Sequence, residues 1–137
     1  MGAWGAGVFE DDTSLDWLEG EYASSGADAV ARALDEAAGT PVTGYLDYDA
    51  GAAARAAAEV VAAVHGNLPE GVETEDLAKL NAHGADVRAL GDIGARARAA
   101  FQRLISENSE LHELWNDGGS DPDWTAAMND LRRRLPS

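Results

Sequence analysis

The chain of 137 residues carries 25 acidic residues against 10 basic ones, a formal charge of −15 at pH 7, and it contains no cysteine. Its length fits one domain spanning residues 1–137, and without thiols neither disulfides nor thiolate-bound metals are expected. The acidic balance disfavours nucleic-acid binding, since phosphate contacts require clustered lysine and arginine, and no apolar span or signal peptide is apparent, so we expect a soluble cytoplasmic protein without membrane attachment.

Residues 1–12 are rich in glycine and show no helical period. Trp4 and Phe9 are large apolar side chains within this stretch and favour burial. We therefore predict an extended N-terminal arm that packs on the helices that follow. Thr13 with Asp16 matches a capping box, which would open the first helix.

The rest of the chain shows the apolar periodicity and the end signals of helices, which predicts an all-α fold, a compact bundle of about five to seven helices. In chain order the predicted helices cover about 14–22, 26–39, 47–66, 75–81, 86–106, 109–115 and 122–135. The alanine-rich third helix is expected at the centre, because small side chains let neighbouring helices approach closely. The loop GTPVTG is the one place where a short extended segment is expected.

Charged side chains on the later helices have predicted roles at helix faces and ends. Asp92 with Arg96 and Arg103 with Glu107 are spaced as exposed i, i+4 ion pairs. The arginine run at 132–134 suits the last turn of a helix, where cations are favoured by the helix dipole. The apolar stripe of the last helix is expected to face inward and consists of Trp124, Met128, Leu131 and Leu135.

The chain opens with MGAWGAGVFEDDTSLDW, which resembles the start of bacterial proteins in domain-of-unknown-function family 4259. Two later segments agree with this family, TGYLDYDAGAAARAAAEVVAAVHG and NSELHELWNDGGSDPDWTAAMNDLRRRL, so the resemblance extends over essentially the whole chain. Asp11 stands where the family usually has Asn, and Ser14 where it usually has Ala. The resemblance implies no activity and no catalytic residues.

Two acidic motifs are similar to metal sites but lack required ligands. Asp47, Asp49 and Glu59 suggest a calcium loop, yet the glycine and the final glutamate of an EF-hand are missing at the required spacing, so helix capping accounts better for these acids. The segment HELWN at 112–116 has Asn where a zinc-protease motif has its second histidine. We therefore expect no metal, no cofactor and no catalytic residues. A solvated acidic face is expected for Glu107, Glu110 and Glu113.

The acids are concentrated early, because residues 1–50 contain eleven acidic residues and one basic residue, Arg32. Such a surface attracts and steers a cationic partner. The first hypothesis is a non-enzymatic macromolecule-binding protein, for example an immunity or antitoxin protein that covers a basic toxin. Its candidate binding residues are Glu10, Asp11, Asp12, Asp16, Glu19, Glu21, Trp4 and Trp17.

The second hypothesis is a small-molecule-binding protein or an enzyme with an unrecognised pocket. Trp17, Trp115 and Trp124 are candidates to line it, with His112 or Glu113 as an acid or base. Aromatic residues at helical spacing are, however, more typical of a core. The third hypothesis is a purely structural or dimeric module.

Overall fold

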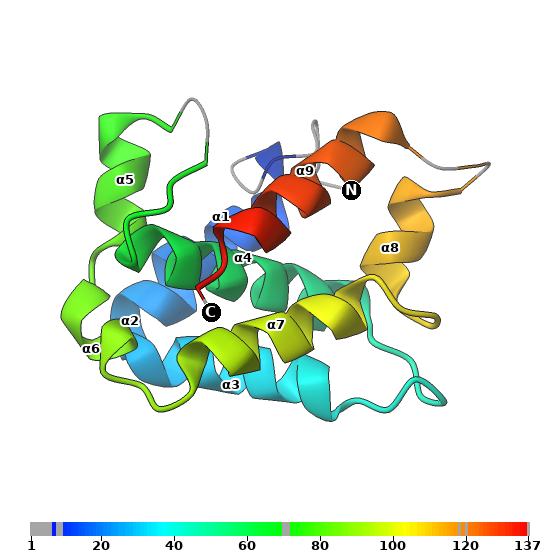
Figure 1. The fold of residues 1–137 in the computed structure, drawn as a ribbon, viewed down its shortest axis with the longest axis horizontal. Helices are drawn as coiled ribbons and strands as arrows, with labels where there is room; N and C mark the ends of the chain where they lie inside the picture. The colour runs from blue at the N-terminus through cyan, green and yellow to red at the C-terminus, as the bar shows by residue number, and fades with distance from the viewer. Residues whose placement is uncertain (1–6, 8–9, 70–71, 118, 120, 137) are drawn as a thin grey trace.

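The protein consists of helices joined by short loops, in a computed structural model that describes residues 7, 10–69, 72–117, 119 and 121–136 (Figure 1). The predicted all-α fold is confirmed: these residues include no strand, and Leu46 and Ser109 form an isolated parallel bridge beside the loop where an extended segment was expected. The helical elements are α1 (Asp12–Trp17), the π-helical turn η2 (Leu18–Tyr22), α2 (Ala23–Ser25), α3 (Ala27–Gly39), α4 (Tyr48–Val64), α5 (Thr74–Leu80), α6 (Gly84–Arg88), α7 (Ile93–Leu104), α8 (Glu110–Trp115) and α9 (Pro122–Arg134).

The first three elements, α1, η2 and α2, follow one another without a break and form one rod, here called the first rod. Counted this way, the described residues contain eight helices, one more than the upper end of the prediction. The first rod begins earlier than predicted because Asp11 is the N-cap, and its Oδ1 accepts a hydrogen bond from the Thr13 backbone N–H at 3.0 Å. The prediction of a capping box at Thr13 and Asp16 is therefore wrong. Most of the predicted arm, including Trp4 and Phe9, lies outside the described residues.

Helix α4 passes through the middle of the bundle, with α3 and α7 on one side and α9 on the other (Figure 1). Thirteen of its 17 residues are buried, so the burial extends around the whole helix. Its many alanines let α3 and α7 pack closely against it, and α3 and α7 also contact each other. The predicted central position of this helix is confirmed.

Helix α9 covers α4 with the predicted apolar stripe, and all four side chains of the stripe are buried. The helix starts at Pro122, and the Asp121 carboxylate caps it by accepting hydrogen bonds from the backbone N–H groups of Asp123 and Trp124. Proline suits this first position because its missing N–H would have no partner there. The largest fully buried side chains of the core are Trp124, Tyr22, Leu18, Leu34, Leu46, Leu80, Leu104, Leu111 and Leu131.

The prediction of one long helix over 86–106 is wrong, because the structure has two helices there, α6 and α7. Between them Asp92 has a φ of 53°, a left-handed conformation that interrupts a helix. Arg96 accordingly does not form the predicted pair with Asp92. Its guanidinium instead binds both carboxylate oxygens of Asp35 on α3, at 2.7 and 3.1 Å. The break thus accompanies the packing of α7 along α3.

Arg103 also differs from its predicted role. Its side chain is not in an exposed ion pair with Glu107, because the residue is only 5% exposed. The guanidinium instead donates hydrogen bonds to backbone carbonyl oxygens of two loops, at residues 40–44 and 107–108. A buried cation therefore organises the end of the bundle where α3, α7 and α8 meet.

Candidate functional site

The predicted binding residues separate into buried and exposed groups. Asp11 is only 1% exposed, and its Oδ2 accepts a hydrogen bond from the Tyr48 hydroxyl at 2.8 Å. Burial, and next the hydrogen bond to Asp11, raise the pKa of Tyr48. Asp11 therefore ties the start of the first rod to α4 and is not presented at the surface. Trp4 lies outside the described residues.

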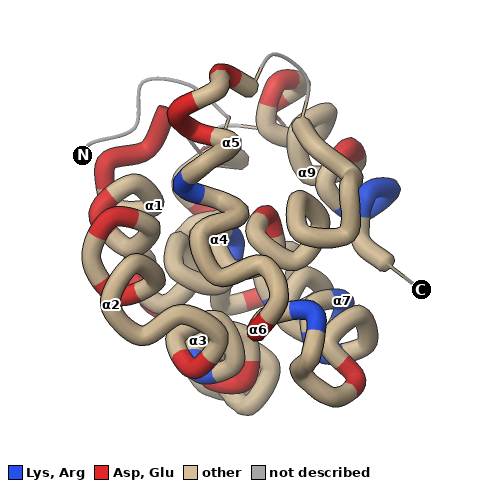
Figure 2. The backbone as a smooth tube through the Cα atoms, turned by 90° about the vertical axis from the view of Figure 1, so that its left-hand side faces the viewer, with Lys and Arg blue, Asp and Glu red and all other residues tan. Residues whose placement is uncertain are grey.

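Five of the six predicted acids are exposed. Figure 2 shows acidic positions along the backbone of the first rod. Glu10 accepts a hydrogen bond from the backbone N–H of Gly7 at 3.2 Å, and Asp12 lies in the first turn of α1. Glu19 pairs with Lys79 of α5 at 2.7 Å, and this hydrogen bond raises the pKa of Lys79. The charge of Glu19 is thus partly compensated within the protein.

The π-helical turn η2 sets the positions of the remaining predicted binding residues, Asp16, Trp17 and Glu21. A π-turn closes hydrogen bonds between residues five apart, and such turns are frequent at functional sites. Trp17 and Tyr22, five positions apart, are both buried and stack with ring centroids 5.8 Å apart and an interplanar angle of 10°. The Tyr22 hydroxyl donates to the Leu80 carbonyl oxygen at 2.7 Å, which anchors this stack to α5. Asp16 and Glu21 remain exposed on the outer side.

Asp16, Glu21 and Trp17 line a groove between the first rod, α3 and the first turns of α4. The groove consists of two hollows of about 420 Å³ each, which adjoin because both are lined by Trp17, Glu21, Asp49 and Ala53. We call it the acidic groove after the carboxylates that line it, namely Asp16, Glu21, Glu36, Asp47 and Asp49.

The acidic groove has a strong excess of negative charge. Among its described lining residues, Arg32 is the single base against five acids. The Arg32 Nε donates to the backbone carbonyl oxygen of Asp28 at 3.4 Å, within its own helix. Grouped carboxylates of this kind produce a local negative potential that attracts cations.

Sequence reasoning missed Glu36, Asp47 and Asp49 as groove residues. Asp47 is the predicted cap of α4, and the structure confirms that role, since its Oδ1 accepts from the Ala50 backbone N–H at 2.9 Å. The spacing of Arg32 and Glu36 places both on one face of α3, which is a usable signal. No sequence signal indicates that this face of α3 lies beside the start of α4.

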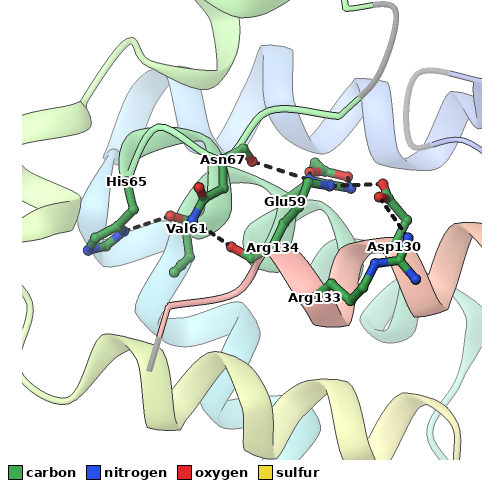
Figure 3. Close-up of polar contacts among 7 residues, drawn as sticks. All are labelled: Glu59, Val61, His65, Asn67, Asp130, Arg133 and Arg134. Atoms are coloured by element: carbon green, nitrogen blue, oxygen red, sulfur yellow. Dashed lines mark hydrogen bonds and ion pairs between the residues drawn. The ribbon is translucent and has the colours of Figure 1, made fainter.

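A series of charged side chains with alternating signs begins in the interior of the bundle and reaches the surface at Asp130, whose side chain is 40% exposed. Arg55 is 3% exposed, and burial lowers its pKa while the charges of Glu59 and Asp11 raise it. Glu59, 5% exposed, pairs through both carboxylate oxygens with Arg134, which also pairs with Asp130 at 2.9 Å (Figure 3). Glu59 is therefore an interior ion-pair partner and not a helix cap. We call this series the ionic line, which runs through Asp11, Arg55, Glu59, Arg134 and Asp130.

Arg134, the last arginine of the basic run in α9, is a member of the ionic line. Beyond its pairing with Glu59, the Arg134 carbonyl oxygen accepts a hydrogen bond from Asn67 Nδ2 at 3.0 Å (Figure 3). His65 ends α4 beside this contact, with its Nδ1 2.8 Å from the Val61 carbonyl oxygen. The contacts of Arg134 with Glu59 and Asn67 fasten the end of α9 to α4 and to the segment that follows it.

The three tryptophans within the described residues belong to two separate aromatic stacks. Trp115 stacks on Trp124 with a centroid distance of 5.6 Å and an interplanar angle of 1°, and the Arg55 guanidinium lies 5.1 Å from the Trp124 ring centroid. Trp124 is only 1% exposed and belongs to the core. Trp17 instead stacks on Tyr22 and contributes to the acidic groove, so this geometry does not place the three tryptophans around one cavity.

The predicted solvated acidic face is confirmed for Glu107 and Glu113, which are exposed, whereas Glu110 is half-buried. Glu113 Oε1 accepts from the Tyr45 hydroxyl at 2.8 Å, and Glu110 Oε1 accepts from the Tyr48 backbone N–H at 2.9 Å. The described part of the chain has no group of three or more His, Cys, Asp or Glu side chains that could hold a metal ion.

Comparison with known proteins gives one match. A family model described as "Domain of unknown function (DUF4259)" matches residues 2–127. No curated protein and no solved structure matches the chain. Over the described residues, none of the helices combines the length and the apolar character that crossing a membrane requires.

Proposed function

The chain belongs to the family described as "Domain of unknown function (DUF4259)", whose description names no activity, and we propose that it is a non-enzymatic protein that binds a cationic partner protein through the acidic groove. The observation that carries this proposal is the grouping of five carboxylates around one groove with a single arginine.

The groove acids come from three separate elements. Asp16 and Glu21 belong to the first rod, Glu36 to α3 and Asp49 to α4. Because like charges repel, their grouping disfavours the folded chain, and a cation bound between them would relieve that repulsion. A partner protein can supply such a cation by placing lysine or arginine side chains in the groove.

The floor of the groove suits such side chains. Trp17 and three alanines, Ala33, Ala50 and Ala53, line it between the carboxylates. The alkyl stems of lysine and arginine pack well on apolar surface while their charged ends remain near carboxylates. A groove with an apolar floor and an acidic rim therefore matches both parts of these side chains.

One concrete form of this function is an immunity or antitoxin protein. A nuclease toxin binds phosphates through a basic active site, and an acidic protein can cover that site by charge complementarity. Such a role requires a rigid acidic surface and no catalytic group in the covering protein.

The proposal is tested by capture from a lysate of the native host. The purified chain is immobilised, washed at low and then moderate salt, and the retained proteins are identified by mass spectrometry. The groove variant Asp16→Asn/Glu21→Gln/Asp49→Asn is run in parallel. We expect the chain to retain a basic protein that elutes as salt rises, since charge interactions are screened over about 8 Å at physiological ionic strength. The groove variant should lose it.

A matched control removes three charges elsewhere. Asp28→Asn, Asp86→Asn and Asp117→Asn change exposed acids outside the groove and leave the same net charge as the groove variant. The control should retain the basic protein. Equal retention by the groove variant and the control, or no retained protein at all, would contradict the proposal.

A further inference from the structure

The loop at 40–46, between α3 and α4, displays two apolar side chains. The backbone N–H of Gly44 donates to the Pro41 carbonyl oxygen at 2.8 Å, which closes a turn that contains Val42. Val42 is 52% exposed and Tyr45 is 53% exposed. These are the two most exposed large hydrophobic residues of the described chain.

The interior of the protein holds this loop in place. The buried Arg103 guanidinium donates hydrogen bonds of 2.7–3.3 Å to the carbonyl oxygens of Thr40, Pro41, Gly44, Glu107 and Asn108. Asn108 Nδ2 donates to the Val42 carbonyl oxygen at 2.7 Å. Hydrogen bonds from a charged donor are stronger than neutral ones. The backbone of the loop is therefore ordered by contacts that do not involve the Val42 side chain.

An ordered loop of this kind suits recognition. A segment that is already fixed loses little conformational entropy when it binds, and covering exposed apolar surface is favourable. Tyrosine is well suited to this task because its ring is apolar and its hydroxyl is polar. Rigidly held loops commonly carry binding residues for the same reasons.

The surface beside the loop is negatively charged. The Tyr45 hydroxyl donates to Glu113, and a hollow of about 440 Å³ lies next to this contact. Its lining consists of Ile105, Ser106, Glu107, Asn108, His112 and Glu113. None of these lining residues is a lysine or arginine. A ligand that spans the loop and the hollow would meet apolar surface first and carboxylates next to it.

We propose that the 40–46 loop and this hollow form a second docking surface, whose occupant is a segment of another protein that carries an apolar side chain beside a lysine or arginine. The apolar side chain covers Val42 and Tyr45, and the cation lies near Glu107 and Glu113. The hollow shares no lining residue with the acidic groove, so this docking surface does not depend on the function proposed for the groove.

A random peptide library displayed on phage and selected on the purified full-length protein tests this proposal. Enriched peptides are synthesised, and their binding is measured by fluorescence anisotropy. We expect them to contain an apolar residue next to lysine or arginine. Val42→Ser/Tyr45→Ser should weaken their binding about tenfold, because exposed aromatic anchors contribute strongly to interfaces.

Two further variants make the outcome specific. Glu107→Gln/Glu113→Gln should weaken binding several-fold and reduce its salt dependence. The groove variant, with all loop residues intact, should bind the peptides as the unchanged chain does. Circular dichroism melting of every variant verifies folding.

Two results would overturn the docking surface. One is the failure of any peptide to be enriched. The other is a set of purely basic peptides that lose affinity for the groove variant while binding the Val42→Ser/Tyr45→Ser and Glu107→Gln/Glu113→Gln variants normally. The second result would support the groove and leave the loop without a partner.

Discussion

The interior of the bundle and the acidic groove use charged side chains in opposite ways. Along the ionic line, carboxylates and guanidinium groups alternate. In the groove, five carboxylates from three elements meet a single arginine. Buried charges are tolerated when they are paired, whereas like charges can gather where water screens them. The difference separates the acids that hold the fold together from the acids that are available to a partner.

The largest expected effect is the loss of the central carboxylate of the ionic line. Glu59→Gln keeps the size of the side chain and removes its charge, which leaves Arg55 and Arg134 without the carboxylate between them. We expect the free energy of unfolding to fall by about 3–5 kcal/mol, because a buried charge that loses its partner remains desolvated. Urea unfolding followed by circular dichroism measures this change.

The control for this substitution is Glu75→Gln on the exposed first turn of α5. It removes one acid without touching the ionic line, and its effect should stay below about 1 kcal/mol. If Glu59→Gln were equally mild, the interior charges would not depend on one another, and the contrast with the groove would disappear.

Removing groove acids should have a smaller effect of opposite sign. Glu21→Gln/Glu36→Gln neutralises two carboxylates that line the same hollow. Glu36 lies in the last turn of α3, where a negative charge interacts unfavourably with the helix dipole. We expect a gain in unfolding free energy of about 0.5 kcal/mol at low ionic strength. The gain should shrink as sodium chloride is added, and urea unfolding at several salt concentrations measures it.

The same kind of substitution is expected to be destabilising in the interior, so the two variants distinguish interior acids from groove acids. A loss of stability for Glu21→Gln/Glu36→Gln, independent of salt, would show that the groove acids serve the fold. The groove would then have no surplus charge to offer a partner.

The smallest effect concerns Tyr45, an exposed residue of the proposed second docking surface. Its hydrogen bond to Glu113 raises the pKa of Tyr45 from its usual 10 to about 12. This interaction favours the folded state below pH 10, and the contribution is lost as the pH rises from 10 through about 12. Glu113→Gln should return the titration of this tyrosine toward pH 10. Alkaline titration by tyrosinate absorbance measures the change.

Tyr22 and Tyr48 provide internal references for that titration. The pKa of each is raised, mainly by burial, and neither side chain contacts Glu113. In Glu113→Gln their transitions should stay at high pH while one of the three tyrosines moves. An unchanged titration of all three would show that Glu113 does not hold Tyr45 in solution.

Much of the fold could be predicted because its signals are local. Gly26 precedes α3, Asp47 caps α4 and Pro122 begins α9, as expected from their sequence positions. The break between α6 and α7 was missed, because Leu90 and Ile93 continue the apolar spacing of a helix across it. The left-handed Asp92 accompanies the packing of α7 on α3, which local propensity does not report.

The candidate site was predicted less well. Of the eight proposed binding residues, Asp16, Glu21 and Trp17 line the acidic groove. Asp11 is buried as a helix cap, and Glu19 is paired with Lys79. Composition indicates how many acids a segment has, but not which of them find a partner after folding.

The sequence by itself determined the all-helical class, the central position of the alanine-rich helix and the negative charge of the first fifty residues. These follow from periodicity, helix propensity and composition, which neighbouring residues define without reference to the rest of the chain. Only the tertiary structure decided that Asp11 and Glu59 are interior charges and that Glu36 and Asp49 join Glu21 in one groove. That division depends on which helix faces are brought together across long sequence separations, since a carboxylate is buried only beside a donor or cation and is otherwise left at the surface.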